Sequence, residues 1–195
     1  MDFQLSEFQQ MLRDSAQRFL RQQHAFEQRR ALLKEGAGLH PALWQQFAEL
    51  GWLALPFAED QGGLGGQHRD LVQIMEAFGE GLVVEPYVAN VLLAGTLIAR
   101  CGAPEQIGDL LEPMMGGTLQ LAFAHDEAGR RFASDARGVV ATEDGDSVVL
   151  SGSKSRVLNG DQAQQLVVSA RLGDDTALFV VPADTDGVKR RAWPV

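Results

Sequence analysis

Apolar residues in the first half of the chain recur at the spacing of helices. The first predicted helix spans residues 6–35. Ser6 and Gln9 have the spacing of a capping box, in which each side chain satisfies a free backbone N–H, and Gly36 to Gly38 is expected to end the helix. Its apolar face is predicted to contain Phe8, Leu12, Phe19 and Leu20. The same kind of pattern predicts four more helices, at residues 41–50, 69–79, 87–100 and 104–115.

The pattern changes after Gly116-Gly117 to short apolar runs separated by turn residues. The stretch Glu143-Asp144-Gly145-Asp146 lies between two such runs and predicts a hairpin. Strands are expected at residues 119–124, 139–142, 148–150, 155–158, 166–170, 177–181 and 188–193. No internal repeat or low-complexity segment interrupts this order.

Helices followed by strands indicate an α+β multidomain protein. We expect an all-α N-terminal domain at residues 1–117 and a partial antiparallel β domain at residues 118–195. The β part is small for a barrel or sandwich that must close its edges. The chain also ends on Trp193-Pro194-Val195, directly after an apparent strand. The β domain is therefore predicted to be incomplete.

Charge and composition narrow the classes of function. The formal net charge of −9 argues against a nucleic-acid partner, which needs a basic face. One cysteine, Cys101, excludes a disulfide framework within the chain and favours a reducing compartment. The most apolar stretch, residues 82–99, is interrupted by Glu85, Pro86 and Asn90, so no membrane span is predicted. The N-terminus does not resemble a secretory signal, and we expect a cytoplasmic protein.

Basic residues are more frequent in the second part of the chain. Residues 1–120 hold 15 acidic and 8 basic residues, whereas residues 121–195 hold 11 and 9. If the protein binds an anionic small molecule, the second part is the better host, although for any single residue a solvated surface of mixed charge is the better explanation.

The short motifs yield no catalytic or metal site. Gly62-Gly63-Leu64-Gly65-Gly66 follows no strand and lacks the spacing of a nucleotide-binding loop, so we interpret it as a turn between helices. Ser151-Gly152-Ser153-Lys154 matches S-x-x-K, but it follows a hairpin strand rather than opening a helix. The four histidines and Cys101 show no metal-ligand spacing. No catalytic residue is predicted from these patterns.

The order of segments resembles one family, the flavin-dependent acyl-CoA dehydrogenases. DFQLSEFQQMLRDSAQRFL resembles its first helix, and LWQQFAELGWLALPFAEDQGGLGG its second helix and the loop that follows. LAFAHDEAG resembles the Thr-Glu-Pro segment that enters its β domain. VVLSGSKSRVLNGDQAQQLVVSAR resembles its Gly-x-Lys-x-x-x-x-Asn strand pair, and ALFVVPADTDGV the next strand. FEQRR, MEAFGEGLVVEPY and LAFAH are most similar to small subunits of pimeloyl-CoA-dehydrogenase-type enzymes.

The resemblance implies a fold, a cofactor and a reaction. Such proteins have a helical domain, a β domain and a C-terminal four-helix domain, which this chain is expected to lack. They bind FAD and remove hydrogens from Cα and Cβ of an acyl-CoA to form a trans-2-enoyl-CoA. A glutamate of the C-terminal domain takes the α-proton and flavin N5 takes the hydride. An electron-transfer partner and a homo- or hetero-oligomer are also implied.

The residues that the resemblance places at the flavin fall in two segments. By position they are Phe123, Ala124, His125 and Asp126, and Arg156, Val157 and Leu158. Several depart from the family: its threonine is Asp126, its proline is Ala128, its aromatic residue is Arg156 and its second hydroxyl residue is Leu158. The family's Gly-Ser-Asp is not recognisable in residues 129–135.

Two of these departures introduce opposite charges at positions that should lie close together. A carboxylate at Asp126 would disfavour an anionic reduced flavin, and a guanidinium at Arg156 would favour it. We hypothesise that the two side chains pair. Two unrelated surface charges are the alternative.

Three functions agree with the sequence. The first is FAD-dependent acyl-CoA dehydrogenation by the parent protein or complex, with this chain inactive alone. The second is a non-catalytic partner subunit that completes the flavin and acyl-CoA site of another chain. The third is an isolated acyl-CoA-binding or helical interaction module.

Overall fold

The computed structural model describes residues 4–34, 38–130 and 132–193. Helices occupy the first part of the chain and a sheet the second, which confirms the predicted α+β order. The helical elements are α1 (Glu7–Gln23), α2 (Phe26–Lys34), α3 (Pro41–Glu49), η1 (Glu59–Gln61), α4 (His68–Gly81), η2 (Val88–Gly95), α5 (Thr96–Cys101) and α6 (Pro104–Met115). The strands are β1 (Leu121–Ala124), β2 (Val140–Asp144), β3 (Ser147–Ser151), β4 (Gln165–Leu172) and β5 (Asp175–Pro182).

The capping box at the start of α1 is confirmed, but the single helix predicted over residues 6–35 is wrong. Ser6 and Gln9 exchange both capping hydrogen bonds. The helix ends at His24, which has a non-helical backbone and a buried ring, and α2 begins after it. The amide of Ala25 donates to the side chain of Gln28, which caps this second start. The predicted stop at residues 36–38 lies mostly outside the described residues.

Aromatic side chains form the core of the helical part. Phe47 lies at its centre, stacked on Phe78 at 5.0 Å and packed against Trp44 and Trp52. Of the four residues predicted for the apolar face of the first helix, Leu12 and Leu20 are buried and Phe19 packs against this core. Phe8 is the exception, because 45% of it is exposed.

The predicted helix over residues 87–100 forms with a different winding. Its first part, η2, is a π-helix, and α5 continues it. A buried asparagine, Asn90, points from η2 to the sheet and accepts a hydrogen bond from the amide of Leu121 at 2.9 Å. Irregular turns of this kind are often placed where a helix must direct a particular side chain. Here the side chain fixes the start of β1.

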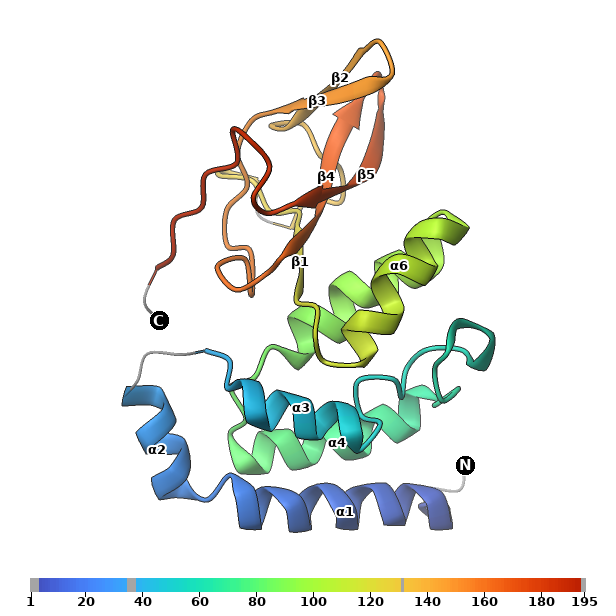
Figure 1. Cartoon of the computed structure of the whole chain (residues 1–195), viewed down its shortest axis with the longest axis vertical. Helices are drawn as coiled ribbons and strands as arrows, with labels where there is room; N and C mark the ends of the chain where they lie inside the picture. Colours follow the sequence, from blue (N-terminus) through green and yellow to red (C-terminus); the bar gives the residue numbers. More distant parts are fainter. Residues whose placement is uncertain (1–3, 35–37, 131, 194–195) are drawn as a thin grey trace.

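The sheet has the order β1-β4-β2-β3, with β5 paired to β4. The predicted hairpin is confirmed as β2 and β3, which are antiparallel, and β4 and β5 form a second antiparallel pair. The sheet is nevertheless mixed, because β4 runs parallel to β1 and to β2. Figure 1 shows the sheet above the helical part, joined to it through β1.

Two predicted strands are wrong. Residues 155–158 form no strand: residues 155–157 are irregular and a turn begins at Leu158, because Arg156 and then Asn159 adopt positive φ angles of 51° and 62° that a strand does not accept. Residues 188–193 form an extended segment outside the sheet. The side chain of Arg190 ties this segment to the chain through backbone carbonyls, so it is held without strand pairing.

The glycine-rich loop is a turn between helical elements, as predicted. Its amides donate back to the preceding segment: Gly63 to Ala58, Gly65 to Phe57 and Gly66 to Leu55, at 2.8–2.9 Å. A side chain at Gly63 would collide with the backbone of Phe57. Because these donors are used within the protein, they are not available to cradle a phosphate.

A buried carboxylate in the helical part predicts that the stability of the protein depends on pH in an unusual way. Burial raises the pKa of Glu85, which lies near His24 and His40, and neither of its carboxylate oxygens has a hydrogen-bond partner among the described residues. A raised pKa in the folded state means that the stabilising contribution is present at low pH and is lost as pH rises through the raised pKa. Glu85→Gln should therefore stabilise the protein at pH 8 more than at pH 5. Urea unfolding of both proteins at the two pH values measures this, and an effect of the same size at both would contradict it.

Candidate functional site

The end of β1 and the segment at residues 155–158, which leads into the turn after β3, lie side by side. The amide of Ser155 donates to the carbonyl of Asp126 at 2.8 Å. The Nε of Arg156 donates to Oδ2 of Asp126 at 3.1 Å, and the two side chains are about half exposed. The hypothesis that these two residues pair is therefore confirmed. Because the pair is close, its opposite charges offset each other at this surface.

The other predicted site residues differ in how far their side chains are buried. Ala124 is buried, and Val157 packs against the core of the sheet. Phe123 is half-buried and packs against the core of the helical part. Leu158 is 60% exposed and offers an apolar side chain two residues after Arg156. The structure therefore brings both predicted segments together, but only some of the predicted site residues have side chains exposed to solvent.

The imidazole of His125 is directed inward. Its Nδ1 lies 2.9 Å from Oγ of Ser169 and its Nε2 lies 2.8 Å from the carbonyl of Ala133. A carbonyl only accepts, so Nε2 carries a proton and donates. Lys154 donates to the same Ser169 oxygen, which leaves the hydroxyl proton free to go to Nδ1. Both ring nitrogens are thus used in hydrogen bonds to the loop and to β4. The ring is also stacked on Phe123, with the ring centroids 5.3 Å apart.

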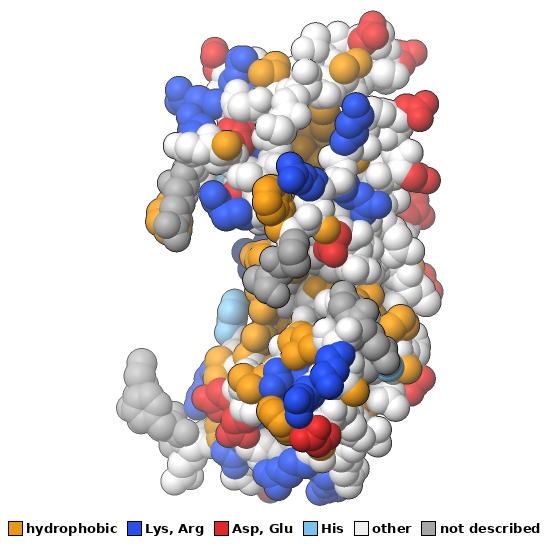
Figure 2. Space-filling model, turned by 90° about the vertical axis from the view of Figure 1, so that its left-hand side faces the viewer, with side chains coloured by type: hydrophobic (Ala, Val, Ile, Leu, Met, Phe, Trp, Pro, Cys, Tyr) orange, Lys and Arg blue, Asp and Glu red, His pale blue; other side chains and the backbone are white. Residues whose placement is uncertain are grey.

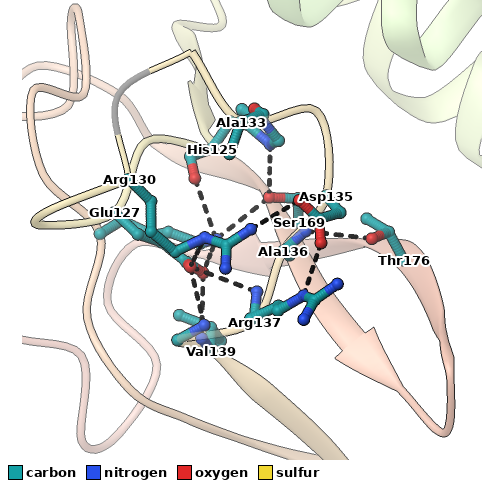
Figure 3. A network of polar contacts seen from close by, with 12 residues as sticks. His125, Glu127, Arg130, Ala133, Asp135, Ala136, Arg137, Val139, Ser169 and Thr176 are labelled. Carbon is teal, nitrogen blue, oxygen red and sulfur yellow. Dashed lines mark hydrogen bonds and ion pairs between the residues drawn. The ribbon is translucent and has the colours of Figure 1, made fainter.

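A buried ion pair between Glu127 and Lys154 fixes the segment that carries the site. The atoms Nζ and Oε1 are 2.7 Å apart, and the two side chains are only 7% and 6% exposed. Nζ also donates to the carbonyl of His125 and to Ser169. Figure 3 shows Glu127 facing the chain that leads into β2, where its carboxylate accepts from three successive amides, those of Arg137, Gly138 and Val139.

The surroundings of Glu127 keep it ionised. Burial alone would raise its pKa, but the hydrogen bonds from Lys154 and from the three amides lower the pKa to about 2. The carboxylate is therefore a fixed negative charge at neutral pH and a weak base. Its role in this structure is to hold the segments together.

Exposed ion pairs bridge the loop between β1 and β2. Asp135 accepts from Arg130 at 2.6 Å and from Arg137 at 2.7 Å. The hydrogen bond from Arg137 is the main cause that lowers the pKa of Asp135. The amide of Ala136 donates to the hydroxyl of Thr176 on β5. These contacts, drawn in Figure 3, hold the loop against the sheet.

The segment that carries Arg156 leads into a turn at residues 158–162, which is attached at both sides. Asn159 donates to the carbonyl of Leu121 at 3.0 Å and so ties the turn to β1. Arg190 donates to carbonyls at the other end of the turn. Sequence reasoning did not assign a site role to Asn159, Arg190, Glu127 or Lys154. For Asn159 and Lys154 the Gly-x-Lys-x-x-x-x-Asn pattern was a signal, whereas Arg190 was visible only as one of several basic residues.

The S-x-x-K match is a coincidence, as predicted, because Lys154 bonds to Glu127, Ser169 and the carbonyl of His125 rather than to Ser151. Within the described ranges, no group of His, Cys, Asp or Glu side chains is arranged to hold a metal ion. No helix among these residues is long and apolar enough to span a membrane. Figure 2 shows several Lys and Arg side chains on the upper part of the molecule and a hollow between the sheet and the helices.

Comparison with known proteins places most of the chain in one group. Residues 6–118 match the model of the acyl-CoA dehydrogenase N-terminal domain. The probable acyl-CoA dehydrogenase YngJ of Bacillus subtilis (strain 168) is 29% identical over 199 residues, which cover 96% of this chain and 51% of that protein. The acyl-CoA dehydrogenase FadE12 of Mycobacterium tuberculosis is 32% identical over 154 residues, covering 74% and 39%. The chain spans about half the length, or less, of these curated relatives.

Solved structures share the fold. The ChsE4-ChsE5 complex from Mycobacterium tuberculosis matches with a TM-score of 0.85 and 28% identity, over 96% of this chain and 50% of that chain. An acyl-CoA dehydrogenase from Geobacillus kaustophilus matches with a TM-score of 0.80 and 25% identity, over 96% and 51%. Helical part and sheet are thus arranged as in these proteins.

Proposed function

Because this chain belongs to the acyl-CoA dehydrogenase family, we propose that it forms the flavin-facing part of an enzyme that oxidises an acyl-CoA thioester to a trans-2-enoyl-CoA. The observation that carries the proposal is the contact between the end of β1 and the segment at residues 155–158, through Asp126, Ser155 and Arg156. These are the two segments that the family resemblance assigns to FAD. An acyl-CoA substrate, an electron-transfer partner and an oligomeric assembly belong to the same proposal.

The residues at this contact fit a flavin. Leu158 presents an exposed apolar side chain, and the opposite charges of Asp126 and Arg156 offset each other in the ion pair. A planar, largely apolar ring system suits such a surface. The residues that would hold FAD are Phe123, Ala124, His125, Asp126, Arg156, Val157 and Leu158. Bound FAD would supply the acceptor for two electrons, and these residues would orient it through backbone groups and side-chain packing.

Neither carboxylate near this surface is suited to remove the α-proton of an acyl-CoA. Asp126 is paired with Arg156, and Glu127 is buried with its pKa lowered to about 2. An efficient general base needs a pKa near the working pH and access to its proton. We therefore propose that these residues bind and orient, and that the chain alone does not turn over acyl-CoA. In the family the base belongs to the C-terminal domain.

The division into a helical domain at residues 1–117 and a β domain at residues 118–195 is part of the proposal. The family model for the N-terminal domain ends at residue 118, which supports this boundary. α6 ends at Met115 and β1 begins at Leu121, so the boundary falls in the connection between helix and sheet. Contacts do cross it, because Leu121 packs in the same core as the helices.

The ion pair provides a test of the flavin site. Arg156→Met leaves the charge of Asp126 without a partner beside the flavin, and the dissociation constant for FAD is expected to rise roughly three- to tenfold. Adding Asp126→Asn should restore most of the affinity. Flavin fluorescence during titration of the full chain measures both. Arg137→Met is the matched control, because Arg137 belongs to an ion pair elsewhere on the surface and should leave FAD binding unchanged.

Three outcomes of these experiments would each contradict a different part of the proposal. Failure of the full-length chain to take up FAD would contradict the proposed function. Uptake with no effect of Arg156→Met, or with an equal effect of Arg137→Met, would place the flavin elsewhere on the chain. Acyl-CoA turnover by the purified chain without a partner would contradict its proposed inactivity.

A non-catalytic partner subunit is the second candidate. Two charged residues, Asp126 and Arg156, stand where the family resemblance expects a hydroxyl and an aromatic residue, and this favours a site altered from the usual one. The ChsE4-ChsE5 structure is by its title a complex of two proteins. Under this reading, the chain should co-purify with a larger homologous subunit, and FAD and activity should both require that subunit. Flavin uptake by this chain alone favours the first candidate instead.

A further inference from the structure

We infer that Arg190 is a positioning residue that sets the conformation of the turn at the proposed flavin site. The inference rests on the proposed function. Arg190 lies in the segment after β5, about 30 residues along the chain from the turn it contacts. Its Nη1 donates to the carbonyls of Gly160, Asp161 and Ala163, at 3.2, 3.2 and 2.8 Å.

These carbonyls lie at the open end of a short helical turn. The amide of Ala163 donates to the carbonyl of Asn159 at 2.9 Å, and that of Gly160 donates to Val157 at 3.1 Å. The last carbonyls of a helical turn have no partner within the turn and carry partial negative charge. A guanidinium at this end satisfies them and attracts them electrostatically. Because Nη1 has two N–H groups and three acceptors, at least one bond is shared.

The turn that Arg190 caps begins at Leu158 and directly follows Arg156 and Val157, the other predicted flavin-facing residues of this segment. Arg156 and Asn159 are in the left-handed region, with φ angles of 51° and 62°, a backbone conformation that other contacts must stabilise. Asn159 holds the front of the turn to β1, and Arg190 holds its back. Without the rear attachment, the turn should sample other conformations before FAD binds. FAD binding would then require the turn to be ordered first, which lowers affinity.

The chain offers a matched control next to this residue. Arg191 is also basic and exposed, but its guanidinium stacks on the ring of Trp193 at 4.5 Å. Arg190→Ala and Arg191→Ala remove the same charge from the same segment. Arg190 is itself exposed, so both variants are expected to fold. Arg190→Lys keeps a charged donor and should retain most of the function.

The test combines hydrogen exchange of the full chain without FAD with titration of FAD into each variant. For Arg190→Ala we expect the amides of Gly160 and Ala163 to exchange about tenfold faster, those of β4 to be unchanged, and the dissociation constant for FAD to rise about tenfold. Arg191→Ala should behave as the wild type. Addition of methylguanidinium should partly restore FAD binding to Arg190→Ala, a rescue that general destabilisation would not produce.

The outcomes distinguish this inference from the proposed function. A wild-type chain that takes up no FAD would overturn the proposed function, and the flavin role of Arg190 with it. If the wild type binds FAD and Arg190→Ala binds it with the same affinity, only the inference is overturned. Equal losses in Arg190→Ala and Arg191→Ala would also overturn it, because they would reflect charge rather than the cap.

Discussion

Glu127→Gln is expected to lower the free energy of unfolding by about 3–5 kcal/mol, the range seen when one partner of a buried ion pair is removed. Lys154 would remain buried without a charged partner, with only neutral acceptors: the carbonyl of His125, Ser169 and the amide oxygen of the new glutamine. The new amide would also turn an N–H group toward the backbone amides that Glu127 now accepts from. Urea unfolding at pH 7 measures the loss.

The pH dependence identifies the cause. The pKa of Glu127 is lowered from 4.5 to about 2, so its contribution is complete above pH 4.5 and is lost as pH falls through about 2. The difference between wild type and Glu127→Gln should shrink over that interval. Arg137→Met removes an exposed ion pair and should cost less than about 1 kcal/mol. Equal losses in the two variants, or a difference that does not change with pH, would show that the buried pair does not hold this region.

Asn90→Ala is expected to cost about 2–3 kcal/mol, because it leaves buried polar groups without partners. Asn90 is fully buried on η2, accepts from the amide of Leu121 at 2.9 Å and donates to the side chain of Gln120 at 3.0 Å. These bonds join the helices to β1, the strand that leads to Asp126. The variant should therefore lose stability and also expose the amide of Leu121 to faster hydrogen exchange.

An exposed hydrogen bond serves as the control. Gln17 donates to Glu80 at 2.9 Å across the surface of α1 and α4, and Gln17→Ala should change stability by less than about 0.5 kcal/mol. If Asn90→Ala is no more costly than Gln17→Ala, or if the exchange of Leu121 is unchanged, then the connection between helices and sheet depends on apolar packing alone.

Much of the fold could be predicted because its signals are local. The capping box of Ser6 and Gln9 and the turn at Gly145 between β2 and β3 are both confirmed. The break at His24 could not be predicted, since no glycine or proline marks it. The histidine is buried, and its burial depends on the folded chain. Residues 155–158 have the composition of a strand, but Arg156 adopts a positive φ and pairs with Asp126, 30 positions earlier in the chain.

At the site, too, some contacts could be predicted from the sequence and others could not. The pairing of Asp126 with Arg156 could be predicted, because the family resemblance brought two altered positions to one place. The buried contacts of Lys154 with Glu127 and Ser169 join residues 27 and 15 positions apart, and only the folded chain brings them together. The cap formed by Arg190 depends on the path of residues 188–193, which were predicted as a strand.

The most direct test of the central claim is hydrogen exchange of the full chain with and without FAD. If the end of β1 and the turn after β3 form the flavin site, FAD should slow the exchange of amides at residues 123–126 and 156–160 and leave α1 and α4 unchanged. Protection confined to other segments, or no change at FAD concentrations well above those that saturate related enzymes, would contradict the account.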